Sequence, residues 1–489
     1  MHISKSSTIR PSRRAVIKAA VGCGAMSSVS MASTFLSLQA SRAMAESNNP
    51  NDFKTLVCVF LNGGNDSFNM LAPTGGEYAD YSTARGGVNN GGIAIPENQL
   101  LSINGPAGRT FGLHPDLESD LTDANSASSG NGVHGLFNSD RLSFVANIGS
   151  LVQPTSNTTY RAQSNLPLGL FSHADLQRHW MSGVPQDRAQ LKGWGGKMAD
   201  IVRDCNDPSS ISMNISLSGV NIFQTGSDVT PYSIATNGAT PINNYFADLS
   251  ATNNARYRAF SQIQTDLLGE TYRNLMSQTL ADTHKISLDA AIQFNNVVNV
   301  VQLATPFDTD GLSQRLKKVA QVIGARTALG QRRQVFFVQL GGFDNHANLI
   351  ADHSSNMTVL SRALSSFYEA TEELNMANDV VTFTASDFSR TLSSNGQGSD
   401  HAWGGNHIIM GGPINGGQIL GDYPTSLVNP VDSTGETINV GRGRLIPTTS
   451  VDQYVSEIAS WFGVPASQLV DVMPNLPNFS DAPALNMFA

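Results

Sequence analysis

Cysteine is scarce in this chain, which has three in 489 residues. Cys23 lies in a segment that we expect to be cleaved off, and the remaining Cys58 and Cys205 make no disulfide framework. Because Cys58 lies within an apolar, strand-like run, we expect it to be a buried free thiol. The chain also lacks P-loops, nucleophile elbows, Cys-x-x-Cys pairs and His-Glu-x-x-His motifs, so none of these common signatures explains its chemistry.

Basic residues are also few. The chain has 30 Lys and Arg against 39 Asp and Glu, a net charge of −9. Residues 1–45 hold six of the basic residues and no acidic one, so their removal leaves a net charge of −15. Such a surface repels nucleic acid backbones and anionic membranes, and no basic patch interleaved with aromatics is present. We exclude nucleic acid as the main partner.

A long hydrophobic run is missing too. The apolar stretch 19–38 is rich in Ala, Ser and Gly and is too weakly apolar for a membrane span. It follows Ser12-Arg13-Arg14-Ala15-Val16-Ile17-Lys18, which resembles the twin-arginine consensus, and it precedes the small-x-small site Ala43-Met44-Ala45. We therefore predict that residues 1–45 are a signal peptide recognised by the twin-arginine translocase. The mature chain would begin at Glu46, lie in the periplasm or outside the cell, and have no transmembrane span.

The mature part alternates apolar strand-like runs with helical patterns, which predicts a mostly parallel sheet between helices. We expect one α/β domain over residues 46–489, with a helical insertion around 254–303. The predicted strands are 55–61, 142–147, 211–217, 220–224, 335–340 and 380–384. The predicted helices are 174–182, 193–203, a long stretch 254–301, and 312–329, 357–374 and 450–462.

Two of these strands lead into clusters of Asp and His. The run 335–340 is followed by Asp344 and His346, and the run 380–384 is followed by Asp387, with Asp400 and His401 close behind. Ligands of open α/β sheets sit beyond the carboxyl ends of the strands. Carboxylates and imidazoles at that edge are typical of a hydrolytic metal site. The other interpretation is structural: Asp344 would cap a helix, and Asp400 would hold His401 neutral near Trp403.

Three further side chains are weaker candidates. Asp66 follows the first strand and Gly63-Gly64, where it would be a ligand or a turn and cap residue. Ser172 opens a predicted helix, where it would be a nucleophile in a positive backbone field or an N-cap with Asp175. Arg390 would bind an anionic substrate oxygen or form a surface ion pair.

The order of the motifs resembles the exported "domain of unknown function 1501" family. The motifs are Leu-Asn-Gly-Gly-Asn-Asp-Ser-Phe-Asn (61–69), Gly-Leu-His-Pro-Asp-Leu (112–117), Phe-Ser-His-Ala-Asp (171–175), Gly-Trp-Gly-Gly-Lys-Met (193–198), Gly-Gly-Phe-Asp-Asn-His (341–346), Ser-Asp-Phe-Ser-Arg-Thr (386–391), Ser-Asp-His-Ala-Trp-Gly-Gly (399–405) and Ile-Pro-Thr-Thr-Ser-Val-Asp-Gln-Tyr (446–454). They cover nearly all of the mature chain.

That family looks like a branch of the alkaline phosphatase and sulfatase superfamily. The resemblance implies a three-layer α/β sandwich, alkaline phosphatase-like, with metal-assisted phosphoryl or sulfuryl transfer. It implies a divalent metal, Zn, Mn, Mg or Ca, and an anionic ester substrate. The implied metal ligands are Asp66, Asp344, His346, Asp387, Asp400 and His401, with Ser172 as nucleophile and Arg390 on the substrate oxygens.

The chain departs from the family pattern at the second cluster. Asp387 stands where the family usually has Glu, and Phe388 stands where well-studied phosphatases have His. These differences favour one metal, or a site kept only for structure, over a two-metal site. The leading reading is an exported hydrolase of phosphate or sulfate esters. The alternative is a non-catalytic envelope protein that keeps the fold for binding or assembly; a carbohydrate binder using loop 225–244 is a third reading that no aromatic platform supports.

Overall fold

Three continuous apolar runs form the centre of the main sheet: β1 (Lys54–Leu61), β8 (Arg333–Leu340) and β9 (Val380–Ser386). Runs of this kind suit strands covered on both faces, and every residue of β1 is buried. The computed structural model describes residues 52–118, 132–207, 211–239, 244–246, 248–432 and 434–489, all within the compact unit Asn49–Ala489. The predicted signal peptide lies outside the described residues.

The main sheet is mostly parallel, as predicted. Its strand order is β11-β5-β10-β9-β1-β8-β6-β7, and β12 also pairs with β5. Within this sheet β10 runs antiparallel to both β5 and β9, and the other pairings are parallel. The remaining strands are β5 (Leu142–Gly149), β6 (Asn214–Ser216), β7 (Tyr232–Ser233), β10 (Gly405–Gly411), β11 (Ile419–Leu420) and β12 (Thr449–Ser450).

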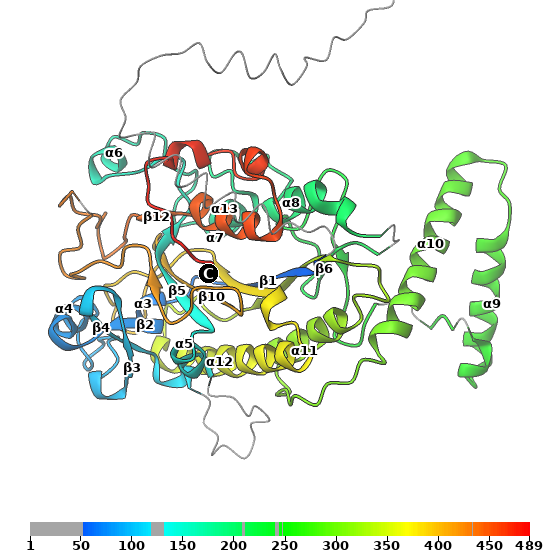
Figure 1. The fold of residues 1–489 in the computed structure, drawn as a ribbon, viewed down its shortest axis with the longest axis horizontal. Coiled ribbons are helices and arrows are strands. Elements are labelled where there is room, and N and C mark those ends of the chain that lie inside the picture. The colour runs from blue at the N-terminus through cyan, green and yellow to red at the C-terminus, as the bar shows by residue number, and fades with distance from the viewer. Residues whose placement is uncertain (1–51, 119–131, 208–210, 240–243, 247, 433) are drawn as a thin grey trace, which may run out of the picture. The chain divides into compact units, whose positions relative to one another are not determined.

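Helices cover both faces of this sheet, so the predicted three-layer arrangement is confirmed. In Figure 1, α5, α11 and α12 lie on one side of the sheet, and α7, α8 and α13 lie on the other. The main helices are α7 (His173–Ser182), α8 (Trp194–Val202), α9 (Ala255–Gly269), α10 (Leu275–Val298), α11 (Gly311–Gly324), α12 (Leu349–Glu373) and α13 (Val451–Phe462). Shorter helices are α3 (Ser67–Met70), α4 (Tyr78–Ala84), α5 (Gly132–Asn138), α6 (Asn157–Arg161) and α14 (Leu469–Val472).

The side chains of β1 alternate between two cores. Val57 and Val59 belong to the core that contains α11 and α12, whereas Cys58 and Phe60 belong to the core that contains α8 and α13. This is the two-residue period of a strand between two helical layers. Cys58 is a buried free thiol, as predicted, and burial raises the pKa of its thiol well above the ordinary value.

Some predicted elements differ from the structure, and several strands were not predicted. Val220–Gln224 is no strand: the Asn221 side chain accepts a hydrogen bond from the Gln224 amide at 2.9 Å and folds the segment into a turn. The long stretch 254–301 is two helices, because Asn274 caps α10 by accepting from the amides of Met276 and Ser277. The strands that were not predicted are β7, β10, β11 and β12 of the main sheet, and the small antiparallel sheet of β2 (Leu71–Pro73), β4 (Thr110–Leu113) and β3 (Leu101–Asn104). No helix among the described residues is long and apolar enough to cross a membrane.

Asp452 in α13 makes the stability of the fold depend on pH. Its side chain is buried, one carboxylate oxygen has no hydrogen-bond partner within the described chain, and burial raises its pKa from 3.8 to about 7. The folded state therefore holds a proton that the unfolded state releases between about pH 4 and pH 7. Stability should fall as the pH rises through this window, because a raised carboxyl pKa means that ionisation opposes folding.

We predict that Asp452→Asn removes this penalty. From about 1.36 kcal/mol per pKa unit, the variant should gain at most about 4 kcal/mol of unfolding free energy above pH 8 and nothing below about pH 4. Urea unfolding at both pH values tests this, with the exposed Asp471→Asn as control. An equal effect of Asp452→Asn at both pH values would show that ionisation of Asp452 is not the cause.

Candidate metal centre

The carboxyl ends of β1, β8 and β9 meet at one edge of the sheet. Leu61 pairs in parallel register with Leu340 on one side and with Ser386 on the other. The loops that follow these strands therefore start side by side, and they carry Asp344 and Asp387. The predicted position of a site at this edge follows directly from the register.

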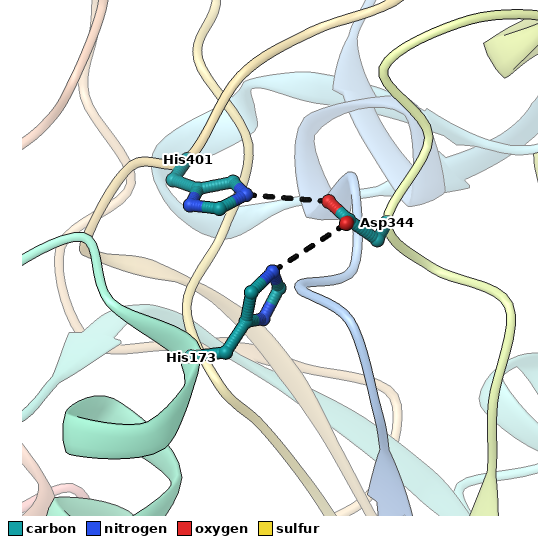
Figure 2. Close-up of side chains that lie close together, drawn as sticks. All are labelled: His173, Asp344 and His401. Atoms are coloured by element: carbon teal, nitrogen blue, oxygen red, sulfur yellow. Dashed lines mark hydrogen bonds and ion pairs between the residues drawn. The ribbon is translucent and has the colours of Figure 1, made fainter.

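Two histidines converge on Asp344 from other parts of the chain. His173 is the first residue of α7, and His401 lies in the loop before β10. Figure 2 shows both rings turned toward the Asp344 carboxylate. The Nε2 atom of His401 lies 3.3 Å from Oδ1 of Asp344, and Nε2 of His173 lies 3.5 Å from Oδ2. One ligand atom from each of the three residues lies within 4.8 Å of the others, which is close enough to hold a metal ion.

His346 brings a third imidazole to the same place. Its Nε2 lies 3.0 Å from Oδ1 of Asp344 and 3.0 Å from Nε2 of His401. The ring is also 4.9 Å from that of His401, measured between centroids. The side chains of Asp344 and His346 are each nearly half exposed, at 46% and 45%, so the site is open to solvent. We call Asp344, His173, His346 and His401 the metal centre.

All three rings are held by their other nitrogen. Nδ1 of His173 lies 2.6 Å from a carboxylate oxygen of Asp387, and Nδ1 of His346 lies 3.1 Å from one of Asp400. Nδ1 of His401 lies 2.8 Å from the carbonyl oxygen of Phe171. These acceptors take hydrogen bonds and cannot donate them, so each Nδ1 carries the proton. A ring whose proton is on Nδ1 presents the Nε2 lone pair to the centre, which is how proteins orient metal-binding histidines.

This donor arrangement fits a cation and is poorly satisfied without one. Nε2 of His346 and of His401 are 3.0 Å apart, and neither can donate to the other when both protons sit on Nδ1. Both lone pairs also face Oδ1 of Asp344. A metal ion, or a proton on one ring, relieves this repulsion. Three imidazoles and a carboxylate match the ligand types of Zn and Mn better than the all-oxygen sets that Ca and Mg prefer.

Arg390 is buried beneath the metal centre rather than facing solvent. Its Nη1 donates to Oδ1 of Asp344 at 2.6 Å and to the Gly63 carbonyl at 3.2 Å, and its Nε and Nη2 donate to Ser399. Its side chain is fully buried. Partial burial raises the pKa of Asp344, but the hydrogen bond and charge of Arg390 outweigh this and leave that pKa below its ordinary value. Arg390 thus keeps Asp344 ionised and fixes its orientation.

The two His residues drawn in Figure 2 have different environments. The hydrogen bond to Asp387 raises the pKa of His173 above 6.5, whereas burial lowers the pKa of His401. Phe388 packs against both rings, with centroids 4.8 Å from His173 and 4.6 Å from His401. It forms an apolar wall of the centre.

Asp66 belongs to no ligand group found in the described chain. It is fully buried and forms an ion pair with Arg85, another fully buried side chain. Burial raises the pKa of Asp66, and the nearby Arg85 and Arg390 oppose that rise. The structure therefore places Asp66 in a buried ion pair, and its role as a metal ligand stays a prediction.

His407 is also buried, with its ring 4.6 Å from that of Trp180 and its pKa lowered to about 3, as expected for a structural histidine.

Asp387 and Asp400 lie behind the histidines instead of beside Asp344. Asp387 accepts from His173, from Nε2 of Gln177 at 2.9 Å and from the Gly63 amide at 3.2 Å. Asp400 contacts His346 and forms an ion pair with Arg442. Both carboxylates are placed to orient a ring, so their role as direct ligands stays a prediction.

Ser172 immediately precedes His173 at the N-cap of α7. Its side chain makes no cap hydrogen bond, and the nearby Asp175 pairs with Arg188, whose hydrogen bond lowers the pKa of that carboxyl. The predicted capping box is therefore not formed, and no contact places the hydroxyl on Asp344. Sequence reasoning missed His173, although it is in the same motif: a histidine at the first position of a helix next to a serine was the available signal.

We predict that Asp387→Asn weakens metal binding through His173 without removing a ligand. The amide oxygen can still accept from Nδ1, but the negative charge that makes the ring more basic is lost. From the usual cost of outer-partner changes, affinity should fall roughly 10–100-fold. Competition titration with a chelating dye measures this, with the exposed Asp228→Asn as control. Unchanged affinity in Asp387→Asn would remove His173 from the proposed ligand set.

The sequence profile of the family described as "Protein of unknown function (DUF1501)" matches residues 53–472, which is most of the chain. The chain belongs to this family. No curated protein matches the DUF1501 chain by sequence.

Several solved structures share elements with the DUF1501 chain at low identity. The lipoteichoic acid synthase LtaP from Listeria monocytogenes matches at 7% identity and a TM-score of 0.33, over 90% of this chain and 81% of that one. The PsFucS1 sulfatase from Pseudoalteromonas sp. matches at 8% and 0.32, over 78% and 67%. A mutant of the alkaline phosphatase PafA matches at 8% and 0.30, over 70% and 64%. These scores are too low to assign an activity to this chain.

Proposed function

We propose that this DUF1501 protein is an exported, divalent-metal-dependent hydrolase of phosphate or sulfate esters. The observation that carries the proposal is the convergence of three Nδ1-anchored histidines on the Asp344 carboxylate, in an open site at the carboxyl edge of a parallel sheet. Zn or Mn is the best match to the donor set. The twin-arginine translocase would deliver the folded, metal-loaded protein to the periplasm or beyond.

The residues of the centre have separate roles in this proposal. Asp344, His173, His346 and His401 hold the ion, and Asp387, Asp400 and the Phe171 carbonyl fix the rings. A bound divalent metal would lower the pKa of a coordinated water and screen the charge of an anionic ester. Arg390 holds Asp344, and because its donors are directed at Asp344, Gly63 and Ser399 it does not bind the substrate oxygens.

Ser172 remains the candidate protein nucleophile because it adjoins His173 at the start of α7. If Ser172 is not the nucleophile, a water activated at the centre takes its place. Transfer of the phosphoryl group to an added alcohol separates the two, because a covalent intermediate partitions between alcohol and water.

A non-catalytic role is the second candidate. It is favoured by Phe388, which fills space beside His173 and His401, and by the hydrogen bond from Arg390 to the Asp344 oxygen nearest His346 and His401. In that case the centre would hold a metal for structure, and the protein would act in binding or assembly at the envelope.

The deciding experiment is an activity screen of the metal-loaded mature protein. Nitrophenyl phosphate and nitrophenyl sulfate serve as substrates, after loading with Zn, Mn, Mg or Ca in separate samples. Turnover that requires Zn or Mn and disappears in His401→Ala supports the hydrolase. A metal-loaded protein that turns over neither ester, nor a diester, would leave the structural role as the better explanation.

A further inference from the structure

Three arginines lie around the metal centre, and two of them are committed to protein partners. Arg390 is buried on Asp344, Gly63 and Ser399. Arg444 donates from Nε to the His401 carbonyl at 3.0 Å, and its guanidinium lies 4.5 Å from the centroid of the Phe171 ring. Arg442 is different: its side chain is 51% exposed, and Nη2 contacts only Asp400. No other hydrogen bond from this side chain is present within the described chain.

The backbone at Arg442 is held in an uncommon conformation. Its φ is +58°, in the left-handed region, between Gly441 at +110° and Gly443 at +71°. The Asn439 side chain accepts from the amides of both glycines at 2.9 and 3.1 Å, and the Arg442 carbonyl accepts from the Ser393 amide at 3.3 Å. A non-glycine residue rarely adopts this conformation unless its surroundings enforce it, and such residues cluster at functional sites. Here the enforced loop directs the Arg442 guanidinium to Asp400, the partner of His346.

Asp400 links this guanidinium to the centre. One carboxylate oxygen contacts Nδ1 of His346, and the other pairs with Nη2 of Arg442. Asp400 therefore sets the position of the Arg442 guanidinium relative to His346. A guanidinium has five N–H donors in a rigid plane, and the pair with Asp400 uses one edge of it. The remaining donors are available to an incoming anion.

We propose that Arg442 and the metal centre together form a binding site for a tetrahedral oxyanion. The ligand class is inorganic phosphate or sulfate and the anionic end of their esters, held by charge-assisted hydrogen bonds from the fork. This inference rests on the proposed function and names its specificity-determining residue. The sequence suggested Arg390 as the residue that binds the anion. Arg442 takes that role in this proposal, because Arg390 is buried and its donors have protein partners.

A merely structural role for Arg442 predicts a different pattern. If Arg442 only fixes the position of Asp400, and through it His346, its removal weakens metal binding. Anion binding then falls only to the extent that metal is lost. If Arg442 binds the anion, its removal weakens anion binding even at full metal occupancy. The two roles separate when metal content and anion affinity are measured on the same sample.

The test is calorimetric titration of inorganic phosphate, and separately of sulfate, into the metal-loaded mature protein freed of excess ion. From the usual weight of a hydrogen bond to a charged group, Arg442→Gln should weaken phosphate binding roughly 10–100-fold at equal metal content. Arg442→Lys should recover part of the affinity, because it keeps the charge and loses the fork. Arg203→Gln is the matched control: Arg203 is 47% exposed and paired with Asp228 away from the centre.

Each outcome decides. Phosphate or sulfate binding that Arg442→Gln weakens, at unchanged metal occupancy, supports the oxyanion site, and the tighter of the two anions names the ester class. Equal anion affinity in the unmodified protein and in Arg442→Gln overturns the inference while the metal centre stands. Loss of anion binding in step with loss of metal also overturns it, in favour of the structural role. An unmodified protein that retains no metal contradicts the proposed function itself, and the inference with it.

Discussion

Alanine at His401 or at His173 is expected to abolish retention of the metal. Each change removes an Nε2 donor that faces the Asp344 carboxylate within 3.5 Å. The loss in affinity should exceed the roughly 10–100-fold that an outer hydrogen-bond partner is worth, because a direct ligand is removed. We predict that metal content, measured by plasma mass spectrometry after dialysis, falls from near stoichiometric to a small fraction.

The control for this experiment is His284→Ala. His284 is exposed on α10 and belongs to no ligand group found in the described chain. It should retain the metal fully, and circular dichroism should show that all three variants keep the fold. Retention of metal by both His173→Ala and His401→Ala would mean that the ion binds elsewhere. The missed histidine matters most here, since His173 was not among the ligands predicted from the sequence.

Alanine at Gly63 is expected to damage both the fold and the metal centre. Gly63 has φ of +117°, and a Cβ there would lie 2.5 Å from the backbone nitrogen of Asp344 and 3.0 Å from the Phe343 carbonyl carbon. Backbone atoms cannot move aside as a flexible side chain can, so the two loops must separate. From the usual cost of side chains at such positions, unfolding free energy should fall by roughly 2–4 kcal/mol.

The same substitution should also weaken metal binding, because Gly63 is hydrogen-bonded to residues that hold the metal ligands. Its amide donates to Asp387 and its carbonyl accepts from Arg390, so displacing the loop disturbs the partners of His173 and Asp344 together. Gly341→Ala is the matched control in the facing loop: its Cβ would meet nothing within 4 Å, and its φ is not in the left-handed region. Denaturant unfolding and dye competition measure the two effects. Similar values for the two alanine variants would show that the close approach at Gly63 does not matter.

The central strands could be predicted because their sequences carry the whole signal. β1, β8 and β9 are continuous apolar runs, and each was found within one or two residues of its true bounds. Asp344 and Asp387 follow the two strands that flank β1, and this pattern led to the prediction of a site at the carboxyl edge of these three strands. β10 was missed because it opens with Gly405-Asn406-His407, which breaks the apolar pattern, and the register that makes it a strand comes from β5 and β9.

The roles within the site were less accessible to the sequence. Asp66 and Asp344 both follow strands after a Gly-Gly pair and read alike, yet one is buried on Arg85 and the other is nearly half exposed among histidines. The ion-pair partner decides which of the two carboxylates is buried, and Arg85 belongs to none of the sequence motifs. Arg390 was expected to face substrate, but its long side chain turns inward to Gly63 and Asp344. Sequence motifs indicate which residue types are candidates for the site, whereas tertiary contacts determine which of them lie together.

The central claim is that one divalent ion binds between three histidines and Asp344. The most direct measurement is a crystal structure of the metal-loaded protein with anomalous diffraction recorded on both sides of the metal absorption edge. The account predicts a single anomalous peak within bonding distance of Nε2 of His173, His346 and His401 and of the Asp344 carboxylate. A loaded crystal with no peak there, or with its peak beside Asp66, would contradict it.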